Sequence, residues 1–452
     1  MAANTWFSEA LRTLAVAALL CVGATAACSA QPSGLGPIAG PPNDAFPGAE
    51  GHGRGSIGGR GGSIIPVTTL ADAGPGSLRA CIDATGPRVC VFRVSGVIRF
   101  TTTRPIIRNP FLTIAGQTAP GGGILLTHAG GENAFTPLVI ENSHDVIVRH
   151  LRIRTDRRGA VREANSAITI VRSSRVMIDH VSTSWALDEN VGGFRQNDQI
   201  TISNSVLAEG VPKHDKCALL SDDPTGPQHL SFLNNLCAHN GDRNPDLNFK
   251  PGSCIEMLNN VLYDGAAEFA EIWETRGGTP VSIVGNYFRA GPSTNAGAHA
   301  MVHQTIGSQG RARLFEAGNI FDGMARGGPT LPLILVPTPP CALTHLPVDA
   351  QAAYRQVLAG AGAFPRDAVD LRLIAEVTSR TGRIVSGPGV LPAIANGTPY
   401  ADRDRDGMDD GWEPANGADS TEFDPWATIS GSRWTNLDRF LDARQRALMA
   451  PN

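Results

Sequence analysis

The chain has 452 residues, of which 51 are Gly and 32 are Pro, and only 6% are aromatic. This composition favours many short strands joined by irregular turns. The formal net charge of −4 gives no basic field of the kind that attracts nucleic acid, and no nucleic-acid partner is expected. The length would accommodate two or three ordinary domains.

Residues 1–28 have the features of an export signal. Arg12 precedes the apolar run "LAVAALLCVGATAAC", which is too short to span a bilayer, and Ala24–Ala26 offers a cleavage site. The run ends in "TAAC", a pattern that would anchor Cys28 to lipid, although Thr25 stands where such signals prefer a larger aliphatic residue. Residues 29–45 suit a flexible Pro/Gly-rich linker. We expect a secreted monomer, extracellular or periplasmic, with no transmembrane segment and with a lipid anchor at Cys28 as one alternative.

The cysteines beyond the leader are disulfide candidates, because exported proteins fold in oxidising compartments. They are Cys81, Cys90, Cys217, Cys237, Cys254 and Cys341. We predict a Cys81–Cys90 bridge, since the two are close in sequence and flank the turn-like "ATGP". The remaining connectivity cannot be deduced from the spacing.

One short pattern of alternating apolar residues occurs eight times. The segments are "FLTIAG", "DVIVRH", "RVMIDH", "QITISN", "HLSFLN", "CIEMLN", "PVSIVG" and "RLFEAG". Their last residues are Gly116, His150, His180, Asn204, Asn234, Asn259, Gly285 and Gly318, with gaps of 24 to 34 residues. Alternation is typical of half-buried strands, and such units are stable only when they stack. The pattern predicts a parallel β-solenoid whose repeated His and Asn are structural, forming side-chain ladders at the turns.

The predicted solenoid occupies residues 46–325, and a different pattern follows it. Residues 326–452 form a tail in which 349–380 has helical spacing, and residues 432–449 read as a terminal helix.

Ionisable residues follow three consecutive repeats at similar positions, eight to twelve residues after the strand ends. They are Asp188, Glu189, Lys213, His214, Lys216 and Arg243. Strands of neighbouring coils lie roughly 4.8 Å apart, so these side chains would form a column about 10 Å long. Surface turns are polar in any case, but here the acids lie on one coil and the bases on the next two. This segregation favours a site that grips one or two units of an acidic sugar chain.

Several segments of the chain resemble the extracellular pectate lyases, a polysaccharide lyase family that folds as a right-handed, single-stranded parallel β-helix. The resemblance rests on "FPGAEGHGRGSIGGRGG", "VTTLADAGPGSLRACI", "LTIAGQTAPGGGILL", "DVIVRHLRIR", "IDHVSTSWALDEN" and "AHNGDRNPDLN". It implies an all-β fold from Phe46 to about residue 325. It also implies Ca²⁺ as cofactor and pectate, or polygalacturonate, as substrate.

The resemblance also assigns roles to residues of the column. Arg243, in "DRNP", matches the catalytic arginine. Asp188 matches an acidic calcium ligand that Glu189 would assist, and Lys213 or Lys216, beside His214, would contact a substrate carboxylate.

The sequence departs from the family pattern at four positions. Asn165, Ser166 and Gly192 stand where calcium ligands are expected. Asn248 stands where a second basic residue is expected, with Lys250 as a substitute. The catalytic calcium site would then be poorer in charge, or would recruit Glu163 or the substrate's own carboxylates.

The reaction that the resemblance implies is a β-elimination in which a base removes the C5 proton of a uronate. Arginine is a poor base unless its pKa falls, and we expect nearby Lys213, Lys216 and a bound cation to lower it. This predicts calcium dependence and an alkaline activity optimum. The competing role for Arg243 is a bidentate clamp on a carboxylate.

A second calcium site is predicted in the tail, from the twelve-residue loop "DRDRDGMDDGWE" at 402–413. Alternating oxygen ligands around a Gly turn are typical of an EF-hand loop. The ligands would be Asp402, Asp404, Asp406, the carbonyl of Met408, Asp410 and Glu413. One copy points to local stabilisation rather than sensing.

The sequence is also compatible with three other functions. The chain could be a non-catalytic β-helix that binds acidic polysaccharide, or a lyase acting on methylated pectin. A glycoside hydrolase would need two separated carboxylates, for which Asp242 and Asp246 are the candidates.

Overall fold

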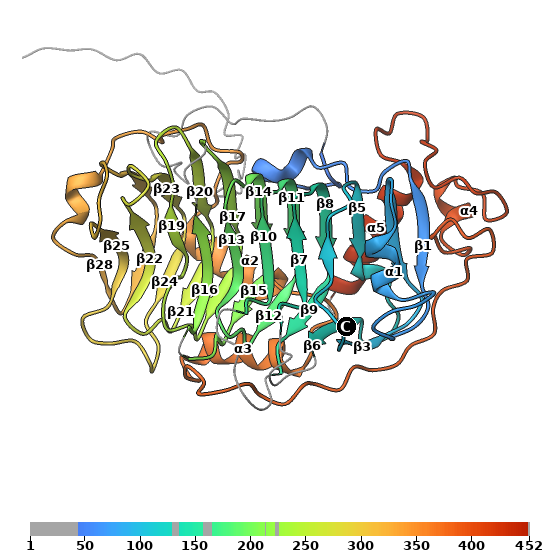
Figure 1. The fold of residues 1–452 in the computed structure, drawn as a ribbon, viewed down its shortest axis with the longest axis horizontal. Helices are drawn as coiled ribbons and strands as arrows, with labels where there is room; N and C mark the ends of the chain where they lie inside the picture. The colour runs from blue at the N-terminus through green and yellow to red at the C-terminus, as the bar shows by residue number, and fades with distance from the viewer. Residues whose placement is uncertain (1–43, 129–134, 157–164, 213, 222–225, 451–452) are drawn as a thin grey trace, which may run out of the picture. The chain divides into compact units, whose positions relative to one another are not determined.

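The repeated segments stack as strands of a parallel β-helix with three sheets (Figure 1). The structure is a computed structural model that describes residues 44–128, 135–156, 165–212, 214–221 and 226–450. The predicted leader therefore lies outside the described residues, as do Lys213, Glu163 and most of the linker. All described residues belong to one compact unit, Pro32–Asn452.

Every pairing within the three sheets is parallel. Sheet A contains β1 (Ser63–Val67), β2 (Arg88–Phe92), β5 (Leu112–Ala115), β8 (His144–Arg149), β11 (Ser174–Asp179), β14 (Asp198–Ser203), β17 (His229–Leu233), β20 (Cys254–Leu258), β23 (Pro280–Val284) and β26 (Arg313–Ala317). Sheet B contains β3 (Gly96–Phe100), β6 (Ile124–His128), β9 (Leu151–Arg154), β12 (Ser182–Ser184), β15 (Val206–Ala208), β18 (Leu236–Ala238), β21 (Val261–Tyr263), β24 (Tyr287–Arg289) and β27 (Ile320–Asp322). Sheet C contains β4 (Ile106–Ile107), β7 (Leu138–Glu141), β10 (Ile168–Val171), β13 (Glu189–Phe194), β16 (Lys216–Ser221), β19 (Asp246–Asn248), β22 (Glu268–Trp273), β25 (His299–Gln304) and β28 (Ala325–Gly327).

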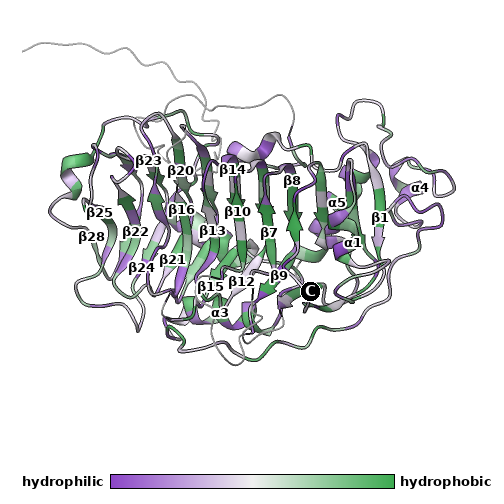
Figure 2. Ribbon diagram, in the orientation of Figure 1, coloured by the Kyte–Doolittle hydropathy of each residue, from purple (hydrophilic) through white to green (hydrophobic). Residues whose placement is uncertain are grey.

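The eight repeated segments of the sequence are the strands of sheet A from β5 to β26, so the predicted solenoid is confirmed. Alternate residues of these strands, such as Val146 and Val148, enter one apolar core with residues of the other two sheets. Figure 2 shows this hydrophobic character along the strands. The sequence pattern did not reveal the shorter strands of sheets B and C.

Helices lie at the start of the solenoid and in the tail. They are α1 (Leu78–Asp83), α2 (Ala350–Gly360), α3 (Ala368–Ser379), α4 (Glu413–Asn416) and α5 (Asn436–Met449), with the 3₁₀ turns η1 (His52–Gly55), η2 (Gly116–Thr118) and η4 (Leu331–Ile334). The predicted helical region 349–380 is confirmed as two helices, α2 and α3, and the terminal helix is α5. Among the described residues, no helix is long and apolar enough to cross a membrane.

The turn between sheets A and B explains the repeated His, Asn and Gly. His150, His180, Asn204, Asn234 and Asn259 have φ between 48° and 56°, a left-handed conformation that Asn and Gly adopt more readily than other residues. A side-chain ladder was predicted at these positions, and the rings of His150 and His180 do stack there, with centroids 4.9 Å apart. The longer, hydrogen-bonded ladder is formed by the residues that follow these positions. Those residues are Asn235, Asn260, Asn286 and Asn319. The backbone N–H of each of the first three donates to the side-chain Oδ1 of the next one, at 2.8 Å.

The disulfide Cys81–Cys90 is confirmed, and two further bridges join Cys217 to Cys237 and Cys254 to Cys341. The last of these ties β20 to the tail.

The described residues at the two ends of the chain cover the outer faces of two of the three sheets. Helices α2 and α3 pack on sheet B, where Val357 and Leu373 meet Leu236 and Val261. On sheet A, Phe46 packs over Ile147 and Met177, while Leu437 and Phe440 of α5 pack over Val89. No residue of a sheet C strand belongs to these outer clusters within the described part of the chain. Among the described residues, the outer face of sheet C is therefore the one that no such apolar cluster covers.

The ladder makes a testable contribution to stability. Asn260 accepts from Asn235 N and donates to Phe232 O, both at 2.8 Å, and it is fully buried. Replacing Asn260 with Ala should lower the free energy of unfolding by about 2–4 kcal/mol, because buried backbone groups lose their partners. Guanidinium denaturation followed by circular dichroism measures this. Exposed Asn396→Ala is the control, and equal midpoints for both variants would contradict the role of the ladder.

Candidate active site on sheet C

Charged residues of four consecutive coils lie in register on sheet C. Glu189 pairs with Lys216, and Lys216 forms a bridge with Asp242. Between the next two strands of sheet C, β19 and β22, Asp246 pairs with Glu271. Residues separated by 25 to 27 positions along the chain are thus direct neighbours in space.

Arg243 lies between two acidic side chains of this array. Its Nη1 donates to Glu189 Oε1 at 2.5 Å, and its Nε lies 3.5 Å from Asp246 Oδ2. The Arg243 side chain is 27% exposed, whereas that of Glu189 is only 3% exposed. Glu189 belongs to the coil two before that of Arg243, so the guanidinium reaches across the strand β16 that lies between them.

The electrostatics of Arg243 differ from the expectation. Burial disfavours its charge, but the carboxylates of Asp246 and Glu189 outweigh this effect and raise its pKa. The prediction that its surroundings lower the pKa of Arg243 is therefore wrong for the described residues. Its closest charged partners are acids, and the basic Lys216 is itself held by Asp242.

The other predicted site residues form two pairs. Lys216 Nζ donates to Asp242 Oδ2 at 3.2 Å, and the Lys216 side chain is only 11% exposed. His214 Nδ1 lies 2.9 Å from Asp188 Oδ1, and its ring is 46% exposed. Lys213 is outside the described residues.

Burial opposes ionisation of the acids that contact Arg243. Burial and the neighbouring Asp188 raise the pKa of Glu189 to about 7, and burial raises that of Asp246 to about 7. Ser166 Oγ lies 3.5 Å from Glu189 Oε2, and a Cβ at Gly192 would lie 2.9 Å from that same Ser166 Oγ. Ser166 and Gly192 thus stand beside Glu189 but supply no carboxylate.

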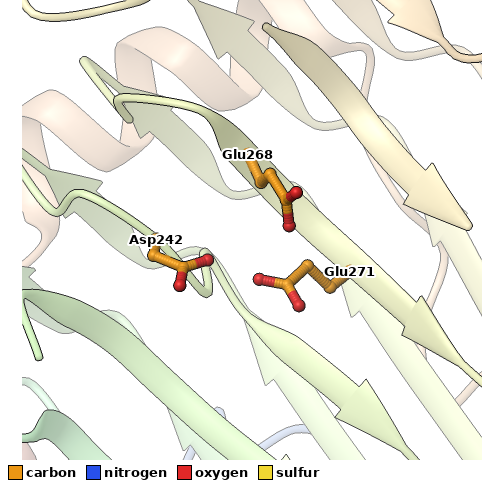
Figure 3. Close-up of side chains that lie close together, drawn as sticks. All are labelled: Asp242, Glu268 and Glu271. Atoms are coloured by element: carbon orange, nitrogen blue, oxygen red, sulfur yellow. The ribbon is translucent and has the colours of Figure 1, made fainter. Parts of the chain in front are cut away.

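A compact acidic cluster lies beside Arg243, on its own coil and the next. Asp242, Glu268 and Glu271 offer oxygens that all lie within 4.8 Å of one another, and Figure 3 shows the three side chains converging. Trp273 Nε1 donates to Glu271 Oε2 at 2.8 Å, while Glu271 Oε1 is buried without a hydrogen-bond partner among the described residues. Burial and the neighbouring carboxyl group of Asp242 raise the pKa of Glu271 to about 10. Such an arrangement of oxygens suits a hard divalent cation.

Sequence reasoning missed Glu268 and Glu271 for a specific reason. Strict alternation would put residues three positions apart on opposite faces of a strand. In β22, Phe269 and Ala270 both belong to the interior core, so the glutamates on either side of them both point outward. The one signal in the sequence was the run of acids in "AAEFAEIWE", one coil after Arg243.

Four of the five predicted acids of the tail loop lie in two carboxylate groups, and Asp424, from outside the loop, belongs to one of them. Asp402, Asp404 and Asp406 form one carboxylate group, and Asp406 forms a second group with Glu413 and Asp424. Asp410 instead accepts from Arg403 N at 2.9 Å, and the Met408 side chain is buried in the apolar cluster with Phe440.

The chain is similar to curated fungal proteins over most of its length. A probable pectate lyase C of Aspergillus fumigatus is 36% identical over 414 residues, which cover 87% of this chain and 92% of that protein. The probable pectate lyase C of Neosartorya fischeri is 35% identical over 412 residues, covering 87% and 92%. No protein-family model matches the chain.

Solved structures share the fold at low sequence identity. The major cedar-pollen allergen Jun a 1 has a TM-score of 0.52 and 18% identity, covering 70% of this chain and 92% of that one. A pectate lyase bound to a hexasaccharide has a TM-score of 0.50 and 14% identity, covering 70% and 96%. At these identities the likeness concerns the fold alone.

Glu271→Gln tests the acidic cluster by its effect on stability. Because the folded protein raises the pKa of Glu271 from 4.5 to about 10, it retains a proton that the unfolded chain loses, and stability falls as the pH rises between these values. Gln has no such proton to lose. In chelator, the variant should gain about 1–3 kcal/mol at pH 8 and nothing at pH 4.

Guanidinium midpoints between pH 4 and pH 9 measure this difference. The exposed Glu422→Gln is the matched control. A gain that does not depend on pH would show that Glu271 is ionised in the folded protein.

Proposed function

The chain belongs to the pectate lyase family, and on this premise we propose that it cleaves polygalacturonate by calcium-assisted β-elimination outside the cytoplasm. The observation that carries the proposal is the partly exposed guanidinium of Arg243, held by Glu189 and Asp246 on the uncovered face of a β-helix. The fungal relatives named above carry the name of this activity.

The reaction needs a base on one side of the sugar and charge stabilisation on the other. The base removes the C5 proton, which is α to the uronate carboxylate. The electrons form a C4–C5 double bond, and the bond from C4 to the glycosidic oxygen breaks. The leaving oxygen takes up a proton, and no water is consumed, so the product is a 4,5-unsaturated oligogalacturonate.

In this proposal Arg243 removes the C5 proton. Its contacts with Glu189 and Asp246 fix the direction of the guanidinium but also raise its pKa, so the neutral, basic form is scarce at neutral pH. A uronate carboxylate that approaches the site would compete for the same guanidinium. Because the population of neutral Arg243 grows as the pH rises, we keep the prediction of an alkaline activity optimum.

The basic residues near Arg243 would receive the substrate's carboxylates. His214 is the more accessible of the two described residues, with its ring 46% exposed. Lys216 would contact a substrate carboxylate only by exchanging its present partner, Asp242. Lys213 lies outside the described residues, so its proposed contact with a substrate carboxylate rests on the sequence.

Two sets of acids near Arg243 can be tested for fit to Ca²⁺. The predicted pair, Asp188 and Glu189, is already engaged by His214 and Arg243. Asp242, Glu268 and Glu271 also have partners, namely Lys216, Gln304 and Trp273. They fit better because three carboxylates converge there and one buried oxygen of Glu271 lacks a hydrogen-bond partner among the described residues. When bound, Ca²⁺ supplies positive charge that stabilises the negative charge developing on the uronate.

Three disulfides support an oxidising location, in agreement with the predicted leader. We propose that the protein acts as a secreted monomer.

Replacing Arg243 with Lys separates a base from a clamp. A lysine keeps the positive charge but cannot form the two parallel hydrogen bonds of a guanidinium. If Arg243 is the base, the variant should lower kcat by about a hundredfold or more at saturating polygalacturonate. Ultraviolet absorbance of the unsaturated product follows the reaction. Exposed Arg355→Lys serves as the control.

A rise in KM with unchanged kcat would instead assign Arg243 to binding. If wild-type protein gives no unsaturated product with calcium at alkaline pH, the pectate lyase proposal fails. Saccharide binding without turnover would then favour a non-catalytic surface protein, and product from methylated pectin without calcium would favour a different lyase.

The position of the catalytic cation is tested by two matched variants. Glu268→Gln should raise the calcium concentration needed for half-maximal activity about tenfold or more, because it removes one of three converging carboxylates. Asp188→Asn should leave that concentration nearly unchanged. The reverse result would place the cation at the predicted Asp188–Glu189 pair.

A further inference from the structure

The acidic loop of the tail lies against the first coils of the solenoid. Gly407 has φ of 88°, and a Cβ there would lie 3.0 Å from Ile64 and 3.2 Å from Val91. The next residue, Met408, is fully buried in the cluster that also contains Val89 and Phe440. Figure 1 shows α4, which begins at the end of this loop, beside β1.

The carboxylates of the loop and of Asp424 converge on two overlapping positions. Oxygens of Asp402, Asp404 and Asp406 lie within 4.8 Å of one another, and so do those of Asp406, Glu413 and Asp424. Asp406 is shared, so the five acids form one continuous set.

Backbone hydrogen bonds use one oxygen of some of these acids and leave the other free. Asp404 Oδ1 accepts from Asp406 N, and Asp406 Oδ1 accepts from Met408 N at 2.9 Å. The second oxygens, Asp404 Oδ2 and Asp406 Oδ2, are buried without a hydrogen-bond partner within the described part of the chain. The loop backbone thus orients these carboxylates and reserves one oxygen of each.

Glu413 is the strongest indication of a ligand. It is fully buried, and neither of its carboxylate oxygens has a hydrogen-bond partner among the residues that the structure describes. Asp406 is equally buried. Arg93 is the one described cation within 4.0 Å of the five acids, and it reaches only Asp402, at 3.5 Å. Buried carboxylates without partners are strongly unfavourable as anions, so they require either a proton or a bound cation.

We propose that Asp402, Asp404, Asp406, Glu413 and Asp424 bind one Ca²⁺ and that this ion fastens the tail to the first coils. The donors are all oxygens, with neither His nor Cys among them, which suits calcium rather than zinc. Asp424 takes the place that the EF-hand pattern gives to Asp410, because Asp410 is turned toward Arg403.

The ion would act on the docking of a larger segment. The loop and α5 share one apolar cluster with β2, and Trp426 Nε1 donates to Gly62 O at 3.0 Å. In the first turn of α5, Asp438 pairs with Arg60 at 3.0 Å. A cation that neutralises the acids of the loop would therefore stabilise the docking of the segment that follows it.

This site is separate from the proposed active site. It lies on the sheet A strands β1 and β2, whereas Arg243 and its acids lie on sheet C, from β13 to β22. Loss of the tail ion should therefore change stability while the rate of elimination stays the same. Failure of one proposal leaves the other intact.

The test uses the full metal-free protein and two matched variants. Asp424→Asn should weaken calcium binding about tenfold or more, whereas Asp410→Asn should change it less than about twofold. Tb³⁺ replaces Ca²⁺ as the probe, since Trp412 directly precedes Glu413 and can sensitise its emission. Glu268→Gln is present in all samples, so that the cluster near Arg243 does not contribute.

Stability provides a second readout. Calcium should raise the melting temperature and protect the segment after residue 400 from limited proteolysis, and the Asp406→Asn, Glu413→Gln double variant should lose both effects. If Asp410→Asn weakens binding as much as Asp424→Asn, the ligand set is wrong. Calcium-independent melting and proteolysis of the wild-type protein would overturn the proposal entirely.

Discussion

The structure depends on the stacking of parallel coils in register. Each strand satisfies its backbone groups with the coils before and after it, and the three sheets enclose one apolar core. Register turns a sequence separation of about one coil into direct contact, as it does between Glu189 and Lys216. The Asn ladder keeps the coils in this register at the turn between sheets A and B. A shift of one residue would turn core side chains outward and separate the charged array.

The position of the proposed active site is related to which faces of the solenoid are covered. The helices of the tail and the first described residues bury apolar side chains on the outer faces of sheets B and A. Sheet C receives no such cover from the described residues, and its outer face carries the charges instead. The tail is therefore part of the architecture, because it covers apolar side chains on the outer faces of sheets A and B.

Both proposed cation sites share one electrostatic feature, namely that buried acids outnumber the cations near them. Near Arg243, the acids Glu189 and Asp246 and the cluster at Glu271 have two cationic neighbours among the described residues, Arg243 itself and Lys216. In the tail, five carboxylates face Arg93 alone among the described residues. The fold maintains this excess because strand pairing and tight turns fix the backbone that carries the acids.

The sequence by itself determined the solenoid, the strands of sheet A, the Cys81–Cys90 bridge, and the candidates Arg243, Glu189 and Lys216. These follow from short-range alternation and from counting along a repeat, which are properties of a one-dimensional pattern. Only the tertiary structure decided that Glu268 and Glu271 share a face with Asp242. It also decided that Asp424, from outside the tail loop, lies with the loop's carboxylates, whereas Asp410 accepts from Arg403 N. Local departures from alternation and contacts between distant segments decide these placements. Side-chain direction at such points depends on packing, which no pattern in the sequence records.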